Sequence, residues 1–377
     1  MHHRVGIVGA GQLARMMAQA AIPLGIEITV LAASATDGAA RVVPNVIVGA
    51  PDDPERIREL ARRVDVVTFD HELVDPDLLE DLERDGVRVH PGPAVMRLAQ
   101  NKRLQRAMMS EADLPSPAWA PVGGLADLER FATDNAWPVV LKATRGGYDG
   151  RGVWVVRDRD EAEALLSQIA AHGTEVLVEA YLPLDGELAV LVARNPSGAC
   201  RVYPATETVQ RDGICHELHV PARFDPSVAR KAEDLAMRIA GTVGSTGILA
   251  IEFFVVGGDV LINELAPRPH NSGHWTIEGV ETSQFEQHLR AVLDWPLGST
   301  DLVAPGVMTR NLLGPDDGSD PFVRIPLALR AADAHLHWYG KEARPGRKIG
   351  HVTARAGSLD EAGRAANAVW SVLMYGE

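Results

Sequence analysis

Cysteine is scarce in this chain, and basic residues are outnumbered by acidic ones. The 377 residues include 2 cysteines, Cys200 and Cys215, which have neither metal-ligand spacing nor a disulfide framework, so we expect small core residues in a reducing compartment. Lys and Arg number 37 against 51 Asp and Glu, and the net charge of −14 argues against a nucleic-acid partner, which needs a basic surface. A small anionic substrate stays compatible with this charge if basic residues gather locally.

Long apolar runs are lacking as well. No segment approaches the roughly 18 apolar residues that cross a membrane. The start, Met1-His2-His3-Arg4, is not followed by the apolar stretch of a signal peptide. The hydrophobic fraction of 46% and the charged fraction of 23% are those of a globular protein, and the length suggests two or three domains. We therefore expect a cytoplasmic protein with no membrane partner.

Strands and helices alternate in the first part of the chain. We expect strands over residues 4–9, 27–32 and 64–69, and helices over residues 12–21 and 54–63. This alternation predicts a parallel sheet. A helix over residues 94–112 should follow.

The pattern changes near residue 137. We expect an antiparallel pair of strands over residues 139–143 and 153–156, a helix over 160–171, strands over 175–179 and 187–194, and a hairpin of strands 249–256 and 260–265. Asp225-Pro226 is typical of the start of a helix. A short αβ tail follows residue 305.

The first glycine motif lies between the first strand and the first helix. Gly9-Ala10-Gly11-Gln12-Leu13-Ala14 fits the dinucleotide fingerprint G-x-G-x-x-A in its expected context. That fingerprint also needs an acidic residue about 20 positions on, at the end of the second strand. Here Leu31-Ala32-Ala33-Ser34-Ala35 occupies that place, and the first acid is Asp37. A tight turn whose helix N-terminus accepts a polar or anionic ligand is the favoured interpretation.

A second glycine-rich loop follows Lys142, which stands near the end of a strand. Residues 145–152 read RGGYDGRG, with four glycines and two arginines. Glycine lets backbone N–H groups approach phosphate oxygens, and arginine adds charge. The loop lacks the Gly-Lys-Ser/Thr of a Walker motif. Phosphate binding under a mobile lid explains this cluster of cations better than a flexible surface hairpin does.

Two glutamates stand in apolar strands on either side of Gly257-Gly258-Asp259. If that triplet is the loop and Val256 opposes Val260, then Glu252 and Glu264 are opposed on one face, with Cβ atoms about 5 Å apart. Like charges so placed need a cation, and carboxylates with nucleotide phosphates suit Mg²⁺. A shift of one residue in register would turn the acids to opposite faces, and solvent-facing acids are the alternative.

Two further segments are rich in polar and basic groups. PRPHNSGHW, residues 267–275, directly follows the second acid and could hold a small anion beside a metal. HLHWYGKEARPGRKIGH, residues 335–351, gathers Lys341, Arg344, Arg347 and Lys348 around a Pro-Gly turn. A substrate phosphate is the natural partner for these arginines, and a solvated basic turn is the alternative.

Taken together, these stretches resemble the N5-carboxyaminoimidazole ribonucleotide synthetases, a family of ATP-grasp enzymes of purine biosynthesis. The resemblance runs essentially from end to end. It rests on GAGQLARM, LKATRGGYDGRG, VEAYLPLDGELAVLVAR, INELAPRPHNSGHW with SQFEQHLRA, and HLHWYGKEARPGRKIGH. The ATP-grasp pattern alone is a moderate signal, whereas NELAPRPHNSGHW and YGKEARPGRKIGH together are specific to the family.

The resemblance implies an α/β protein with an α+β central part. Its ATP-grasp fold would carry an N-terminal Rossmann-like preATP-grasp domain over residues 1–100, an ATP-grasp domain over 101–300 with a lid at about 115–182, and a small C-terminal domain over 301–377. The resemblance also suggests a homodimer.

ATP and Mg²⁺ are the implied cofactors. The implied ATP-binding residues are Lys102, Lys142, Gly146, Gly147, Tyr148, Asp149, Gly150, Arg151, Gly152, Glu179, Ala180, Tyr181, Leu182, Glu187, Gln210, Asn263 and Glu264. Among these, Glu179, Ala180 and Leu182 would border the adenine and Glu187 the ribose. Glu252 and Glu264 would hold the metal.

The implied substrates are bicarbonate and 5-aminoimidazole ribonucleotide. The ribonucleotide would contact Gln12, Glu72, Lys341, Arg347 and Lys348, with its phosphate on the last three. The implied catalytic residues are Arg268, His270, Asn271 and Lys348, with Arg268 and His270 at the bicarbonate site.

Two positions depart from the family pattern. Asp70-His71-Glu72 stands where the family often reads E-x-E, which puts the substrate contact there in doubt. Gln210 stands where histidine is frequent, and glutamine also donates a hydrogen bond.

The implied reaction joins bicarbonate to the exocyclic amine of the ribonucleotide through carboxyphosphate, while ATP becomes ADP and phosphate. A site of lysine, arginine, glycine amides and magnesium, without a Ser-His-Asp set or a catalytic cysteine, suits such phosphoryl transfer. Two alternatives stay open. One is another ATP-grasp acyl-phosphate ligase, such as a formate-dependent glycinamide ribonucleotide transformylase. The other is a non-enzymatic dinucleotide-sensing protein.

Overall fold

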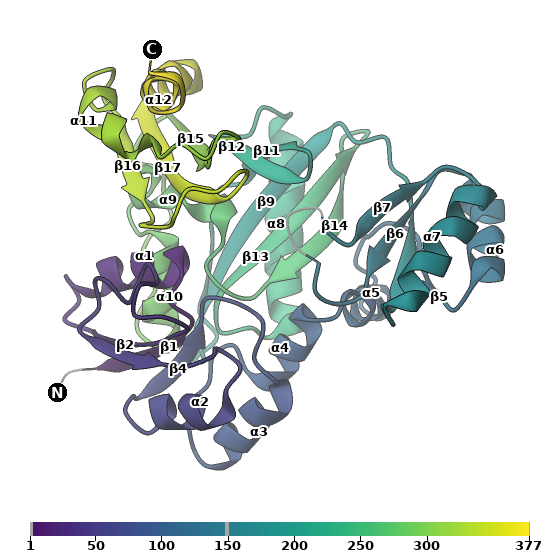
Figure 1. Ribbon diagram of the computed structural model, residues 1–377, viewed down its shortest axis with the longest axis horizontal. Coiled ribbons are helices and arrows are strands. Elements are labelled where there is room, and N and C mark those ends of the chain that lie inside the picture. Colours follow the sequence, from purple (N-terminus) through teal and green to yellow (C-terminus); the bar gives the residue numbers. More distant parts are fainter. Residues whose placement is uncertain (1–2, 148–150, 377) are drawn as a thin grey trace.

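Three β-sheets organise the protein (Figure 1). The structure is a computed structural model, and it describes residues 3–147 and 151–376. The N-terminal sheet has the strand order β3-β2-β1-β4, and all its pairs are parallel, as the alternating pattern predicted. Its elements are β1 (Arg4–Val8), α1 (Gln12–Ala21), β2 (Glu27–Ala32), β3 (Asn45–Val48), α2 (Pro54–Ala61), β4 (Val66–Phe69), α3 (Pro76–Arg84) and α4 (Pro93–Ala99).

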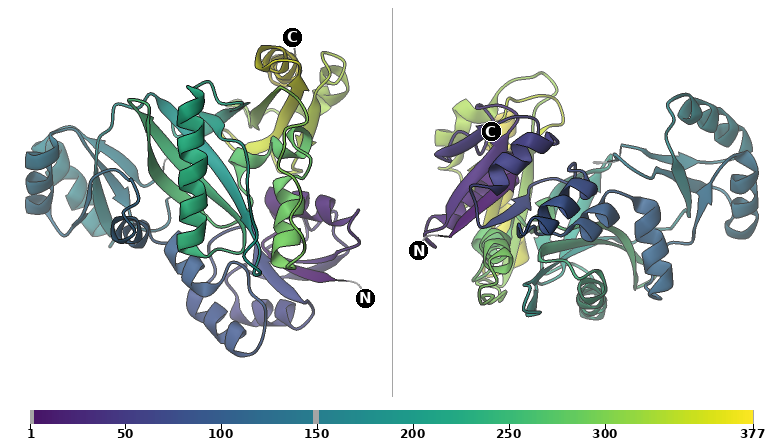
Figure 2. Two further views of the ribbon diagram at one scale, coloured as in Figure 1. Left: turned by 180° about the vertical axis from the view of Figure 1, so that it is seen from behind. Right: turned by 90° about the horizontal axis from the view of Figure 1, so that it is seen from below.

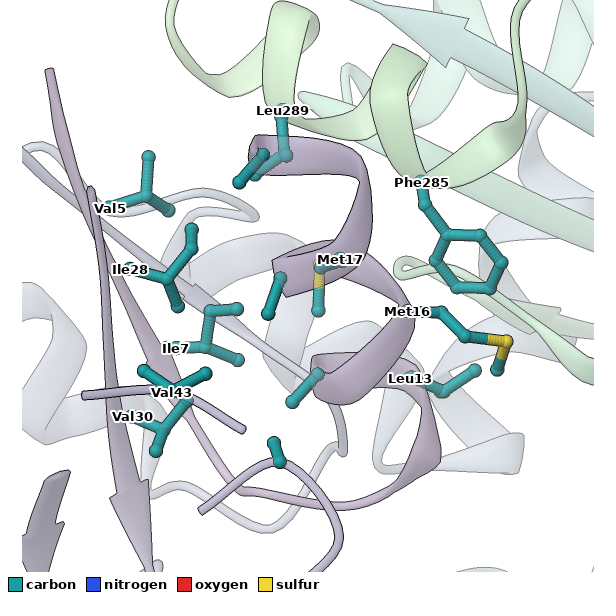
Figure 3. Packing of buried hydrophobic residues seen from close by; sticks show 14 of the residues in the cluster. Val5, Ile7, Leu13, Met16, Met17, Ile28, Val30, Val43, Phe285 and Leu289 are labelled. Carbon is teal, nitrogen blue, oxygen red and sulfur yellow. The ribbon is translucent and has the colours of Figure 1, made fainter. Parts of the chain in front are cut away.

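The core of the N-terminal sheet is shared with a helix from much later in the chain. Apolar residues at helical spacing turn one face of α1 inward, including Leu13, Met16 and Met17. Phe285 and Leu289 of α10 (Gln284–Val292) pack into the same cluster (Figure 3). The first glycine turn, at the start of α1, is thereby fixed against the central part of the chain.

The segment predicted as one helix over residues 94–112 is two helices, so that prediction was wrong. Helix α4 ends at Ala99, and α5 (Lys102–Glu111) begins after Asn101. The Asn101 side chain accepts hydrogen bonds from the N–H groups of Arg103 and Leu104, at 3.0 and 3.2 Å. A side chain that caps the next helix interrupts the apolar pattern without a proline or glycine to announce the break.

A second, four-stranded sheet forms the outlying part of the molecule, at the right of Figure 1. Its order is β5-β8-β6-β7, and the predicted pairing of residues 139–143 with 153–156 is confirmed. Apolar residues of α6 and α7 form one cluster with residues of this sheet. The elements are β5 (Trp119–Val122), α6 (Leu125–Asn135), β6 (Val139–Ala143), β7 (Val153–Val156), α7 (Arg159–Ala171) and β8 (Val176–Ala180).

The third sheet has nine strands and joins the central and C-terminal parts. Its order is β14-β13-β9-β11-β12-β15-β17-β16, with β10 paired to β9. The central elements are β9 (Gly186–Arg194), β10 (Cys200–Val202), β11 (Thr206–Arg211), β12 (Ile214–Val220), α8 (Pro226–Val243), β13 (Gly247–Val256), β14 (Asp259–Ala266), a 3₁₀ turn (Asn271–Gly273) and α9 (Thr276–Gly279). The later ones are β15 (Gly306–Leu313), a 3₁₀ turn (Pro321–Arg324), α11 (Ile325–Ala328), β16 (His335–Trp338), β17 (Lys348–Ala356) and α12 (Leu359–Tyr375).

Helix α8 covers one face of this sheet, as Figure 2 shows from behind. It begins at the predicted Asp225-Pro226 pair, where the Asp225 side chain accepts from the N–H of Ser227. The apolar side chains of β9 and β13 that face α8 leave Glu187, Glu252 and Phe254 on the other face. Among the described residues, no helix is both long and apolar enough to cross a membrane.

Candidate active site

The β13–β14 hairpin places two carboxylates directly opposite each other. Its turn is Gly257-Gly258, with φ of +59° and +80°, so Val256 pairs with Asp259 and the predicted pairing with Val260 was wrong. A bulge on β14 corrects the register: Phe253 pairs with Ile262, and Glu252 then pairs with Glu264. Asn263 is the extra residue of this bulge. The predicted opposition of Glu252 and Glu264 is therefore confirmed, by a different route.

The two carboxylates differ in their compensating charge, because Glu264 has a close lysine and Glu252, among the described residues, does not. Burial raises the pKa of Glu252 to about 7, and the charges of Glu264 and Glu187 act in the same direction. Lys102 Nζ lies 2.5 Å from Glu264 Oε1, and His270 Nε2 lies 3.7 Å from Glu252 Oε1. No group of three or more His, Cys, Asp or Glu side chains among the described residues could hold a metal ion. Two opposed carboxylates are oxygen ligands of the kind that hold a divalent cation together with oxygen atoms of a bound molecule.

A buried ion network links α5, the outlying sheet and the hairpin. Arg106 Nε and Lys142 Nζ lie 2.7 and 2.8 Å from the two oxygens of Glu179. Arg106 also donates to the carbonyl of Asn263 at 2.8 Å, and Lys142 donates to the Asn263 Oδ1 at 3.0 Å. Burial acts to raise the pKa of Glu179, but Lys142 and Arg106 outweigh it and hold the pKa below its usual value. The Glu179 carboxylate, predicted beside the adenine, faces these two cations.

Arg106 is a residue that sequence reasoning missed. It lies four positions after Lys102 on α5, on the buried face with Gln105 and Met109. That spacing from a lysine already expected at the phosphates was the available signal. The contact of Asp70 with the first glycine turn, described below, was also not predicted.

The second glycine loop starts next to the N-terminus of helix α5 in space. The N–H of Lys102 donates to the carbonyl of Thr144 at 2.9 Å, and the N–H of Ala143 donates to the carbonyl of Gly152 at 2.8 Å. Gly147 lies so close to the Arg151 carbonyl that a Cβ there would be 2.7 Å from its oxygen. Gly146 and Gly152 have φ of +76° and +73°. Gly146, Gly147 and Gly152 are therefore required by the path of the described part of the loop.

Three of the predicted ATP-binding residues in this loop, Tyr148, Asp149 and Gly150, lie outside the described residues. Ala180 ends β8, and after it Tyr181 is exposed and Leu182 half-buried. The nucleotide contacts of all these residues stay predictions, and so does that of Gln210 on β11.

Glu187 lies on the same face of the central sheet as the carboxylate pair. It pairs with Phe254, two residues along from the Ala189–Glu252 pair. Lys142 Nζ lies 5.4 Å from the centre of the Phe254 ring. Burial raises the pKa of Glu187 to about 7. Side chains of both sheets thus meet around the predicted phosphate and metal residues.

The polar segment after β14 lies against the same carboxylates. Arg268 Nε is 2.7 Å from Glu72 Oε1, which joins two predicted residues from distant parts of the chain. His270 is held at its backbone by Gln284, which accepts from its N–H at 2.9 Å and donates to its carbonyl at 2.7 Å. Burial holds the pKa of His270 well below its usual value, so the ring is neutral. The Asn271 Oδ1 is buried without a hydrogen-bond partner among the described residues.

A cavity of about 480 Å³ lies at the first glycine turn. Its lining includes Gly11, Gln12, Asp70, Lys341 and Arg347, so three of the predicted substrate residues meet there. The other two predicted contacts are not among its described lining residues: Glu72 lies against Arg268, and the charge of Lys348 acts on Glu252 and His270. This charge effect places Lys348 nearer to the predicted catalytic residues than to the cavity, and both of its predicted roles stay predictions.

Asp70 occupies the place where a dinucleotide would need to bind. Its Oδ2 accepts from the N–H of Gly11 at 2.6 Å. A Cβ on Gly9, whose φ is +105°, would lie 1.7 Å from Asp70 Oδ1. Burial raises the pKa of Asp70. A side chain of the protein thus uses the anion-binding N–H of this turn, which disfavours the dinucleotide interpretation.

The fold and the site define a class: nucleotide-dependent ligases of the ATP-grasp type. Family models match three consecutive parts of the chain: the ribonucleotide synthetase preATP-grasp domain at residues 1–100, the ATP-grasp domain at 107–285, and the phosphoribosylaminoimidazole carboxylase C-terminal domain at 307–365.

Curated relatives and solved structures agree with these matches. N5-carboxyaminoimidazole ribonucleotide synthase of Mycobacterium tuberculosis is 46% identical over 355 residues, which cover 92% of this chain and 82% of that protein. The Bacillus subtilis enzyme is 38% identical, with 95% and 92% covered. The synthase of Aspergillus clavatus, solved with ADP and 5-aminoimidazole ribonucleotide, superposes with a TM-score of 0.90 at 31% identity, covering 99% of this chain and 98% of that one. The chain belongs to the N5-carboxyaminoimidazole ribonucleotide synthase family and is an ATP-dependent ligase.

Proposed function

We propose that the protein carboxylates the exocyclic amine of 5-aminoimidazole ribonucleotide with bicarbonate, while ATP is converted to ADP and phosphate. Membership of the family supports the reaction, and the Aspergillus enzyme was solved in complex with both ADP and the ribonucleotide. The observation that carries the proposal is the meeting of two opposed carboxylates, Glu252 and Glu264, with Lys102 and Lys142 beside the glycine loop.

Bicarbonate is a poor electrophile until one of its oxygens is phosphorylated. Lys142 and the backbone of residues 146–152 would hold the phosphates of ATP, and Arg268 and His270 would hold bicarbonate. Glu252 and Glu264 fit Mg²⁺, because they are opposed oxygen ligands and because burial and the charge of Glu264 raise the pKa of Glu252, which a bound cation would offset. When bound there, the ion would neutralise charge on the phosphates. Carboxyphosphate, or carbon dioxide released from it, would then react with the amine.

The ribonucleotide would lie in the cavity at the first glycine turn. Lys341 and Arg347 would bind its phosphate, and Gln12 would contact its polar groups. Asp70 accepts the N–H of Gly11 in the same cavity, so this N–H is already used and would not bind a phosphate placed at the turn itself. The two basic side chains therefore make the Lys341 side the proposed place of the phosphate. Homodimer formation and a cytoplasmic location complete the proposal.

The test is ADP release with matched pairs of acid and acceptor. Bicarbonate with 5-aminoimidazole ribonucleotide should give fast release that depends on Mg²⁺ and stops with a chelator. Faster release with formate and glycinamide ribonucleotide would instead favour the other acyl-phosphate ligase. Measurable NAD binding without ATP turnover would favour the dinucleotide-sensing alternative, which the Asp70 contact disfavours.

A further inference from the structure

Three histidine rings, two of them fully buried, form a stack between the predicted bicarbonate segment and the paired strands β16 and β17. His274, from the segment after β14, stacks on His351 of β17 with ring centres 4.8 Å apart. His351 stacks in turn on His337 of β16, at 4.5 Å and an interplanar angle of 15°. His274 and His351 are both 0% exposed. The stack therefore joins two segments that are separated by more than sixty residues in the chain.

Several polar atoms of the stack are unpaired. Both ring nitrogens of His274 and the Nε2 of His351 are buried without a hydrogen-bond partner among the described residues. An apolar side chain would fill such a place at lower cost, because buried polar atoms without partners are unfavourable. Parallel stacking sets the ring nitrogens side by side rather than in line, so the rings do not form a continuous proton path. The function that the stack can serve is to hold the segments it joins at a fixed relative position.

The side chain of His351 also contacts Tyr339, which leads to the substrate cavity. Its Nδ1 lies 2.7 Å from the hydroxyl of Tyr339. Tyr339 is buried at 1% exposure, and the Nζ of Lys341 lies over its ring, 5.7 Å from the centre. Lys341 lines the cavity of about 480 Å³. A continuous set of contacts thus runs from His274, through His351 and Tyr339, to the lysine expected to bind the substrate phosphate.

We propose that His351 is a positioning residue, which holds Tyr339 and thereby Lys341 at a fixed place relative to the segment of residues 268–275. His274 connects the stack to this segment, and Tyr339 connects it to Lys341. Fixing the lysine relative to the segment would set the distance that the substrate must span between its phosphate and its reacting amine. The inference deepens the proposed function, since it concerns the site where the sugar phosphate would bind.

The hydrogen bond can be removed from either end while the rings are kept. Tyr339→Phe and His351→Phe should each weaken binding of ribose 5-phosphate by roughly fivefold, the factor that corresponds to one net hydrogen bond. The double variant should bind about as weakly as either single variant, because both remove the same contact. In turnover assays, the KM for 5-aminoimidazole ribonucleotide should rise while the KM for ATP stays unchanged. His351→Asn, which retains a partner for the Tyr339 hydroxyl, should bind ribose 5-phosphate nearly as wild type does.

Tyr203→Phe is the matched control, because Tyr203 is equally buried and its hydroxyl donates to the carbonyl of Thr282 at 2.9 Å. It should lower the melting temperature without affecting sugar-phosphate binding. If Tyr339→Phe behaves in the same way, or if the two Phe substitutions are additive, the positioning role is overturned. The two proposals can fail separately. If the variants change ribose 5-phosphate binding as expected but the wild type shows no turnover with the ribonucleotide, the positioning role is upheld and only the proposed reaction is refuted.

Discussion

Glu264 is both a predicted metal ligand and the ion-pair partner of Lys102. Glu264→Gln keeps the shape of the side chain but removes one negative charge from the pair with Glu252, and it also removes the ion partner of Lys102. We expect turnover to fall by about a hundredfold or more, because metal binding loses a charged oxygen ligand. The melting temperature should stay near that of the wild type. Steady-state ADP release checks this, with Glu281→Gln at an exposed position as control. Activity near the wild-type level would show that Glu264 is not a metal ligand.

Two lysines of the basic cluster should differ in their kinetic effects. Lys341 lines the substrate cavity, whereas the charge of Lys348 acts on Glu252 and His270. Lys341→Ala should raise the KM for the ribonucleotide by roughly tenfold or more, the effect of losing a charge-assisted hydrogen bond, with little change in kcat. Lys348→Ala should chiefly lower kcat. Steady-state kinetics of both variants gives kcat and the KM for the ribonucleotide. If both variants changed the same parameter, the two lysines would not have separate roles.

Much of this site could be predicted from residue types and local spacing in the sequence. The carboxylate pair, the glycine loop and the cavity lysine were all predicted from them. The correct register of the pair, however, depends on the bulge at Asn263, which offsets the shorter Gly257-Gly258 turn. Two such shifts cancel, and neither is visible in the alternation of apolar residues. The contact of Asp70 with Gly11 was not predicted for a related reason, since it spans 59 residues.

At the scale of elements, helix α5 is held by its charged residues as much as by its apolar ones. Arg106→Met leaves the buried Glu179 with Lys142 as its ion-pair partner, and it also removes the donor to the Asn263 carbonyl. We expect the free energy of unfolding to fall by about 3 kcal/mol, the usual cost of breaking a buried ion pair. Denaturant unfolding measures it. Arg103→Met, on the exposed face of the same helix, should change stability by less than about 0.5 kcal/mol. A loss no larger than this control would mean that the network contributes nothing.

Elements with strong periodicity were predicted well, and short elements less so. Helix α1 and strand β2 have the predicted bounds. The break at Asn101 was missed, as were β3 and α3. Strand β3 has four residues, and half of them are exposed, so its alternation is weak. Helix α3 carries the start signal Asp75-Pro76, the same pair that announced α8, and could have been found from it.

At the scale of the whole molecule, the parts are joined by shared cores rather than by linkers. Helix α10 packs into the core of the N-terminal sheet, and β15, β16 and β17 extend the central sheet. Lengths and composition could not predict this, because it depends on contacts between distant segments. The net charge of −14 does not describe the site, where the described cations Lys102, Arg106 and Lys142 gather. Several neutral histidines are buried at these junctions.

One of these histidines joins the N-terminal sheet to the central one and makes stability depend on pH. His288 on α10 lies 2.8 Å from the Thr68 hydroxyl of β4, and its Nδ1 accepts from the N–H of Ile248 of β13 at 3.0 Å. Burial lowers its pKa from 6.5 to about 3. The unfolded chain therefore binds one more proton than the folded chain between these values. The stabilisation is present above pH 6.5 and is lost as the pH falls toward 3.

Replacing His288 should make stability less sensitive to acid. His288→Asn retains an acceptor for the Ile248 N–H but does not titrate. Between pH 7.5 and 5.0, we expect the wild type to lose about 2 kcal/mol more of its free energy of unfolding than this variant does. Urea unfolding at the two pH values measures the difference, with His172→Asn at an exposed position as control. Equal losses in the wild type and His288→Asn would show that the ring is not held neutral in the folded protein, and the junction would then owe its acid sensitivity to other groups.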